Sequence, residues 1–399
     1  MKRIADLFVR LRRLLAREGL SGAMVRLSHP KRAGMGDGTP PLALPLNLAE
    51  GVPAELRAAL TALLGADAMQ ARPAGGATLH VDPGPGSPAP GDVVLFHRPL
   101  AADDDTETLL GLARCAAVLV PDAAWHGALL AAGVPPSRVF ILPPPGHPGL
   151  QGGLARWLVA AGALLPKALE PGWFPALSGL QPGARLCLSL PEAAARRAHF
   201  TRLALPGFEV FDGVRLSPSW QAAGHSHALI ARAAQQRRAA PLTVCEDDLV
   251  PSEDFEARLG RIEAYLAGAE WDVFSGLLTD FSPEARIHHV ARRGDLTFVH
   301  LDVTIGMVFN IYGPRALQRL AEWPRRGPEA DTDTVDLWLG RMPGLRVVTT
   351  LPFLVGHDDS HASTVFGFSN RRYTPMIRQS ERRLARAVAA FEAEGSATG

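Results

Sequence analysis

Three consecutive carboxylates follow a short apolar segment in the second half of the chain. Residues 242–245 read LTVC, and Glu246, Asp247 and Asp248 come directly after them. A short apolar run of this kind is typical of a buried strand, and ligands of open α/β sheets bind just beyond the carboxyl ends of strands. Adjacent carboxylates repel one another unless a cation or a basic group compensates them. Their oxygen atoms suit Mg²⁺ or Mn²⁺, so the pattern predicts a metal site that could also contact a diphosphate.

The same triplet has a second interpretation, in which it is a solvated loop that caps a helix expected from about Ser252. A second acidic triplet, Asp103 to Asp105, has no apolar strand before it and precedes a helical segment. Because carboxylates are stabilising at helix N-termini, we expect this second triplet to be a helix cap.

Alternating apolar and helical segments surround these motifs. In the first half, the expected strands are 92–97, 117–121 and 138–143, and the expected helices are 105–115, 123–133 and 154–165. Such alternation predicts a parallel α/β layer. A stretch rich in Pro and Gly, 171–184, breaks the pattern, and we place a domain boundary there.

The second half resumes the alternation of strands and helices. The expected strands are 185–190, 208–213, 242–245, 271–276, 297–302, 306–312 and 345–352, and the expected helices are 192–204, 225–239, 252–267, 313–322 and 333–340. A charged helix is expected at 377–394. The resulting domain organisation is an amphipathic helix at 1–24, a Rossmann-like α/β domain at 25–175, an α/β domain at 183–375 and a helical tail at 376–399.

Composition narrows the class of protein. The chain has 399 residues, of which 47% are hydrophobic and 20% charged, with a net charge of +1, which fits a globular protein and gives no case for a nucleic-acid binder. Cys115, Cys187 and Cys245 form no CxxC pair, and we expect them to be buried in a reducing compartment.

No apolar stretch reaches the 18 residues of a membrane span, and arginines interrupt the N-terminal apolar positions, so we expect neither a transmembrane helix nor a signal peptide. The N-terminal segment could lie on an anionic membrane through residues 1–20, or equally dock on its own domain. The expected location is therefore cytoplasmic, with possible contact to the inner face of the membrane.

Several further motifs occur in a fixed order around the acidic triplet. They are RLCLSLPEAAARRAHF (185–200), FEVFDGV (208–214), GHSHALIARAA (224–234), LTVCEDDLVP (242–251), GMVFNIYGPRALQRL (306–320) and TVDLWL (334–339). Through these motifs, residues 185–365 resemble glycosyltransferase family 25, which includes lipooligosaccharide and collagen sugar transferases. Two features depart from the family pattern: Cys245 replaces an aliphatic residue, and GHDDSHAST (356–364) matches the family's terminal segment poorly.

The resemblance implies a GT-A-type fold and sugar transfer with inversion, from a nucleotide-sugar donor, expected to be a UDP-sugar, to a cell-surface glycan or glycolipid. It implies that the donor is bound by Ser189, Arg196, Arg197, Asp212, Ser226, His227, Glu246 and Asp247. It also implies a Mn²⁺ or Mg²⁺ ion held by Asp247 and Asp248, with His357 as a further ligand, and catalytic roles for Asp248 and for Asp336 as general base.

Each of these roles has a structural alternative. Arg197 could be a surface arginine and His227 a structural histidine at a helix start. Asp336 could be an exposed residue of an acidic helix, and His357 could belong to a surface loop.

A weaker resemblance concerns the first half. Within residues 90–165, the segment 113–146 resembles the end of the first Rossmann-like domain of GT-B glycosyltransferases, but no donor-binding second GT-B domain is recognisable. This half could be a remnant, an acceptor-binding module or a partner-docking module. For the whole chain, the alternatives to a transferase are a catalytically degenerate sugar- or partner-binding protein and a metal-dependent hydrolase of nucleotide sugars.

Overall fold

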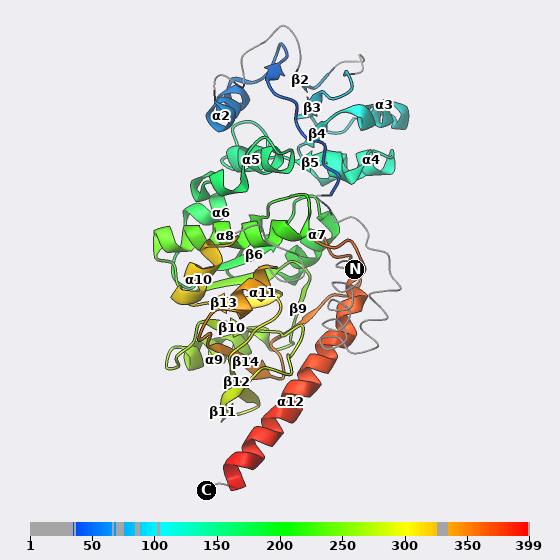
Figure 1. Cartoon of the computed structure of the whole chain (residues 1–399). Helices are drawn as coiled ribbons and strands as arrows, with labels where there is room; N and C mark the ends of the chain where they lie inside the picture. Colours follow the sequence, from blue (N-terminus) through cyan, green and yellow to red (C-terminus); the bar gives the residue numbers. More distant parts are fainter. Residues whose placement is uncertain are drawn as a thin grey trace, which may run out of the picture.

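The computed structural model describes residues 35, 37–65, 68, 76–83, 88–101, 104–324 and 334–397. The amphipathic helix predicted at residues 1–24 lies outside them, and with it the predicted membrane contact. Two sheets divide the described chain, one five-stranded and one eight-stranded, and they are stacked along the long direction of the molecule (Figure 1). Among the described residues, no helix combines the length and the apolar character needed to span a bilayer.

The first sheet is entirely parallel, with its strands in chain order. Its strands are β1 (Leu46–Leu48), β2 (Ala77–Val81), β3 (Val93–Leu95), β4 (Ala117–Val120) and β5 (Val139–Ile141). Its helices are α2 (Ala54–Leu64), α3 (Thr106–Gly111), α4 (Ala123–Ala131) and α5 (Leu150–Ala160). The predicted parallel α/β layer is therefore confirmed. Asp105 caps α3 by accepting a 2.8 Å hydrogen bond from the Thr108 amide, as expected of the second acidic triplet.

The second sheet is mixed, in the order β11-β12-β14-β10-β13-β8-β6-β7. Its strands are β6 (Arg185–Ser189), β7 (Phe208–Asp212), β8 (Leu242–Glu246), β10 (Val273–Ser275), β11 (Ile287–Arg293), β12 (Leu296–Leu301), β13 (Phe309–Tyr312) and β14 (Val347–Leu351). Strands β6, β7 and β8 run parallel, whereas β13 is antiparallel to both of its neighbours, β8 and β10. A separate two-stranded ladder joins β9 (Leu249–Pro251) to β15 (Val355–His357).

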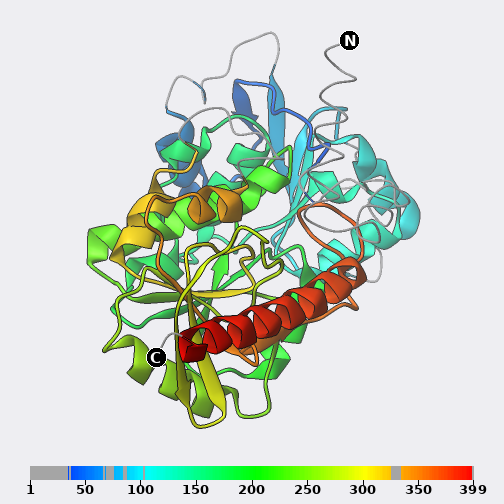
Figure 2. The ribbon, with the colours of Figure 1, turned by 60° about the horizontal axis from the view of Figure 1, so that its bottom comes forward.

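Helices cover both faces of this sheet. They are α6 (Pro175–Ser178), α7 (Ala194–Leu203), α8 (Trp220–Arg237), α9 (Phe255–Leu266), α10 (Pro314–Ala321), α11 (Val335–Gly340) and α12 (Tyr373–Ala397). On β13, Phe309 packs edge-on against Phe255 of α9, and Tyr312 packs edge-on against His227 of α8. Odd and even positions of a strand point to opposite faces, so α9 and α8 cover opposite faces of the sheet. The long helix α12 begins four residues before the predicted 377 and runs diagonally across one side of the molecule (Figure 2).

The two sheets share one hydrophobic core, which includes residues of α5, α6, β6 and α8. A buried charge cluster reinforces the junction. Glu192, which follows β6, accepts hydrogen bonds from the Ile141 amide at 3.1 Å and from Arg156 of α5 at 3.0 Å, while Arg215 lies 3.8 Å away. The segment 171–184, where we placed a domain boundary, contains α6 and contributes to this shared core. The three cysteines are free and buried, as expected.

Candidate functional site

The acidic triplet lies where the order of the parallel strands reverses. From β6 the chain passes through α7 to β7 on one side, and then returns through α8 to β8 on the other side of β6. Ser189 is the last residue of β6 and Glu246 the last of β8. In open α/β sheets, ligands bind outside the carboxyl ends of strands at such a switch point. The topology therefore places this edge of the sheet where a ligand is expected.

Asp247 is the central acceptor of a buried network. It is 3% exposed, and its Oδ2 accepts a 2.6 Å hydrogen bond from the Ser189 hydroxyl. Its Oδ1 accepts a 2.7 Å hydrogen bond from Nε of Arg196, and Nη2 of the same guanidinium lies 2.6 Å from that oxygen. Both oxygens of Asp247 are thus engaged by protein donors.

Asp248 shares the same arginine. It is 2% exposed, and its Oδ2 lies 2.9 Å from Nη2 of Arg196 and 3.5 Å from Nε2 of His357. Asn370 donates a 2.7 Å hydrogen bond to this oxygen. The other oxygen, Oδ1, is buried and has no hydrogen-bond partner among the described residues. One carboxylate oxygen of the triplet therefore remains available to a ligand.

Burial and the charge of Arg196 together set the pKa values of the acidic triplet. Although burial opposes its charge, the neighbouring carboxylates raise the pKa of Arg196. Burial alone would raise the pKa of Asp248, but Arg196, His357 and Asn370 together lower it to about 2. Burial raises the pKa of Asp247 despite the arginine. Burial and the charge of Asp248 raise the pKa of Glu246 to about 8. The repulsion noted in the sequence is thus compensated by an internal cation.

Asp336 influences the electrostatics of Glu246. It stands in the first turn of α11, where it accepts hydrogen bonds from the Thr334 hydroxyl at 2.6 Å and the Leu337 amide at 2.9 Å. Its charge contributes to the raised pKa of Glu246 and, after burial, to the raised pKa of Tyr312. The structure thus brings the predicted base into the electrostatic environment of the triplet.

His227 belongs to the same region and is completely enclosed. Its Nδ1 donates a 2.9 Å hydrogen bond to the Ala223 carbonyl, which can only accept, so Nε2 carries a lone pair. Burial lowers the pKa of His227 to about 4, and Nε2 has no partner among the described residues. Asn310 Oδ1 is likewise buried without a described partner. Two buried hydrogen-bond acceptors without a described partner therefore lie on the face of the second sheet that carries Tyr312.

The remaining predicted residues do not touch the triplet. Arg197 forms an ion pair with Asp212, which ties α7 to β7. Ser226 donates to the Ala222 carbonyl at 2.8 Å and accepts from the Val214 amide at 2.9 Å. These contacts join α7 to β7 and α8 to the residues after β7, and the donor-binding role of the three residues stays a prediction.

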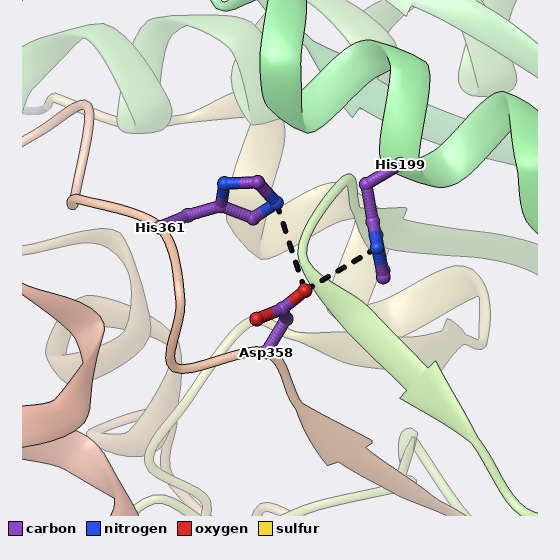
Figure 3. A group of neighbouring side chains, drawn as sticks. All are labelled: His199, Asp358 and His361. Carbon is purple, nitrogen blue, oxygen red and sulfur yellow. Dashed lines mark ion pairs between the residues drawn. The ribbon is translucent and has the colours of Figure 1, made fainter.

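A second cluster was not anticipated from the sequence. His199, Asp358 and His361 each present one ligand atom within 4.8 Å of the others, and they are the only group of at least three His, Cys, Asp or Glu side chains in the described chain that meets this criterion (Figure 3). The predicted set of Asp247, Asp248 and His357 does not form such a group. Two features of the sequence could have indicated this cluster. They are the spacing of Asp358 and His361, and the position of His199 one helical turn after Arg196.

No protein-family model matches the chain, and no curated protein matches it either.

Proposed function

We propose that this protein is a glycosyltransferase that moves a sugar from a nucleotide-sugar donor, expected to be a UDP-sugar, to a cell-surface glycan or glycolipid acceptor with inversion. In this proposal residues 183–375 form a GT-A-like domain, and residues 25–175 a Rossmann-like module. One observation carries it: Ser189, Arg196, Asp247 and Asp248 converge from three segments at the switch point between β6 and β8. A rigid polar site at that position suits a phosphate-containing ligand.

The cation in this proposal, Mn²⁺ or Mg²⁺, fits part of the predicted ligand set. Asp248 has an unpartnered buried oxygen, and His357 lies beside the same carboxylate. Asp247 does not fit as a ligand because both its oxygens accept hydrogen bonds, so its role is to hold Arg196. When bound, the cation would supply charge stabilisation to a departing diphosphate.

Two further carboxyl groups, of Asp336 and Glu246, have separate roles in the proposed reaction. An inverting transfer requires a base within reach of the acceptor hydroxyl. Asp336 takes this role in the proposal, because it is only partly buried at the start of α11. In the metal-free site, burial and Asp248 raise the pKa of Glu246 to about 8, so its protonated carboxyl can donate a hydrogen bond to a donor oxygen.

A calorimetric titration of UDP, with and without Mn²⁺, tests the donor site. The wild type is compared with Asp248→Asn and with the control Asp295→Asn, which alters an exposed aspartate paired with Arg261. We expect Mn²⁺-dependent binding in the wild type and the control, and its loss in Asp248→Asn. Metal-independent binding that survives Asp248→Asn, or no binding by the folded wild type, would refute the proposed donor site.

The second candidate is a catalytically degenerate sugar- or partner-binding protein. Retaining three adjacent carboxylates without a cation is electrostatically costly, which argues against this candidate. Arg196 supplies part of the compensating charge without a metal ion, which weakens the objection. Donor binding without release of UDP in the presence of a panel of glycan acceptors would favour this candidate.

A further inference from the structure

The cluster of His199, Asp358 and His361 has the composition of a transition-metal site. Two imidazole nitrogens and one carboxylate are ligands that suit Zn²⁺, Fe²⁺ and Mn²⁺. The side chains come from α7 and from the segment after β15, and both histidines point at the same oxygen of Asp358 (Figure 3). The three side chains are 16–18% exposed, so a bound ion would be largely shielded and still reachable from solvent.

The separations between the side chains match those around a metal ion better than those of hydrogen bonds. Nδ1 of His199 lies 3.3 Å, and Nε2 of His361 3.6 Å, from Oδ2 of Asp358. Charge-assisted hydrogen bonds between nitrogen and a carboxylate are shorter, about 2.7–2.9 Å. Ligands of a tetrahedral zinc ion, with bonds of about 2.0–2.2 Å, are about 3.3–3.6 Å apart.

The tautomer of His199 is also the one expected of a metal ligand. Its Nε2 lies 3.1 Å from the Leu249 carbonyl oxygen, which can only accept, so Nε2 carries the hydrogen. In the neutral ring, Nδ1 then presents a lone pair to the lone pairs of Asp358, an arrangement that a metal cation between them would stabilise. Metal-bound histidines characteristically donate their other N–H to a carbonyl or carboxylate in this way.

An ordinary ion pair would explain the cluster less well. His199 would have to be doubly protonated to attract Asp358, and His361 would then have to share the same oxygen. Nε2 of His361 is buried and makes no hydrogen bond to a described residue. Asp358 is held in place independently, because Oδ1 accepts a 2.8 Å hydrogen bond from the Ser360 amide. Oδ2 is therefore the oxygen that is left for a cation.

We infer that His199, Asp358 and His361 bind one divalent transition-metal ion, with Zn²⁺ as the preferred ion and a fourth coordination position open. The inference does not depend on sugar transfer. The ion would fix the segment after β15 against α7. Because His357 at the end of β15 and Asn370 farther along the chain both reach Asp248, and the segment between them carries Asp358 and His361, the metal would also brace the acidic triplet from outside it.

The test uses the full chain after treatment with a chelator. Zn²⁺ binding is measured by calorimetry, and Co²⁺ is added as a spectroscopic substitute whose visible absorption reports its coordination. His199→Ala and His361→Ala remove ligands, whereas the control His288→Ala removes an exposed histidine that lies 3.9 Å from Asp302. A fourth variant, His357→Ala, probes the neighbouring acidic triplet. Circular dichroism verifies that each variant is folded.

We expect one tightly bound equivalent of Zn²⁺, separate from any weaker binding at Asp248, and an intense Co²⁺ band in the wild type, in His288→Ala and in His357→Ala. Both signals should be lost in His199→Ala and His361→Ala. The Zn²⁺ affinity of these variants should fall by more than the roughly 10–100-fold that results from removing a residue hydrogen-bonded to a metal ligand. Retention of the equivalent in the two ligand variants, its loss in His357→Ala alone, or the absence of binding in the wild type would each overturn the inference. If a ligand variant does not fold, His361→Gln replaces it under the same criteria.

Discussion

Replacement of Arg196 by glutamine should destabilise the protein strongly. Its guanidinium lies within 2.6–2.9 Å of oxygens on Asp247 and Asp248, and both aspartates are at most 3% exposed. Glutamine keeps part of the side-chain volume but removes the charge. Removal of one partner from a buried ion pair costs about 3–5 kcal/mol, because the remaining charge stays desolvated and unpaired. That is a large part of the roughly 5–15 kcal/mol that stabilises a typical protein.

The loss should depend on pH in a defined direction. In the wild type, the depressed pKa of Asp248, about 2, contributes stability that is present above the ordinary aspartate pKa and is lost as the pH falls towards 2. Without Arg196, burial would raise the pKa values of both aspartates. The variant would then be most stable when they are protonated, and the difference from the wild type should shrink as the pH is lowered to about 4.

Urea unfolding monitored by circular dichroism measures both effects. The matched control is Arg261→Gln, which removes an arginine from its exposed pair with Asp295 and should change stability little. The double variant Arg196→Gln with Asp247→Asn should recover part of the loss, because it removes one of the two unpaired charges. A cost below about 1 kcal/mol at neutral pH, or a cost that does not vary with pH, would refute the description of Arg196 as the buried counter-ion.

Three further predictions concern other buried positions. Glu246→Gln should leave the melting temperature nearly unchanged near pH 5 and raise it near pH 8, because the raised pKa of about 8 makes the wild type lose stability between the ordinary glutamate pKa and that value. Gly224→Ala should lower the free energy of unfolding in urea by about 1–3 kcal/mol through overpacking, since a Cβ there would lie 2.3–2.5 Å from ring carbons of Trp323. The helical control Gly260→Ala, with open space around it, should instead raise that free energy by about 1 kcal/mol. Glu192→Gln should cost about 3–5 kcal/mol in urea unfolding, because it leaves two buried arginines without their counter-ion.

Each of these predictions can fail in a recognisable way. A Glu246→Gln effect that is the same at both pH values would show that the carboxyl is ionised and solvated. Equal gains from the two glycine substitutions would show that the indole ring moves aside. A Glu192 variant as stable as the wild type would show that the junction between the sheets is held by apolar packing alone.

The periodic features of the sequence were sufficient to predict most of the fold. The strands before Glu246 and at 117–121 were recognisable because each is a short apolar run between polar or Pro-containing boundaries. The ladder of β9 and β15 was missed, because each strand has only three residues and its partner lies about a hundred residues away. Strand β11 was missed because its sequence, IHHVARR, is largely polar on both faces.

The site was predictable in position but not in its charge balance. The acidic triplet was recognisable because it abuts a strand. The position of Arg196 was also singled out, as a donor-binding residue. That Arg196 instead neutralises Asp247 and Asp248 depends on the direction of α7 after β6, which no local pattern specifies. The histidine cluster was missed for the same reason, since His199 and His361 meet only after the segment that follows β15 folds back on α7.

Charge balance also decides how the proposed donor must bind. With both aspartates ionised, Asp247 and Asp248 carry two negative charges against the one positive charge of Arg196, and Glu246 is neutral below about pH 8. A net charge of minus one would repel a diphosphate, whereas one divalent cation beside Asp248 would make the site positive and attract it. We therefore expect the affinity for UDP at pH 7 to rise with Mn²⁺ and, in the absence of Mn²⁺, to fall as the pH rises through about 8, when Glu246 ionises. In Glu246→Gln, the Mn²⁺ dependence should remain and the pH dependence should disappear. Titrations of both proteins at pH 7 and pH 9 measure this, and a pH dependence that persists in the glutamine variant would assign it to another group.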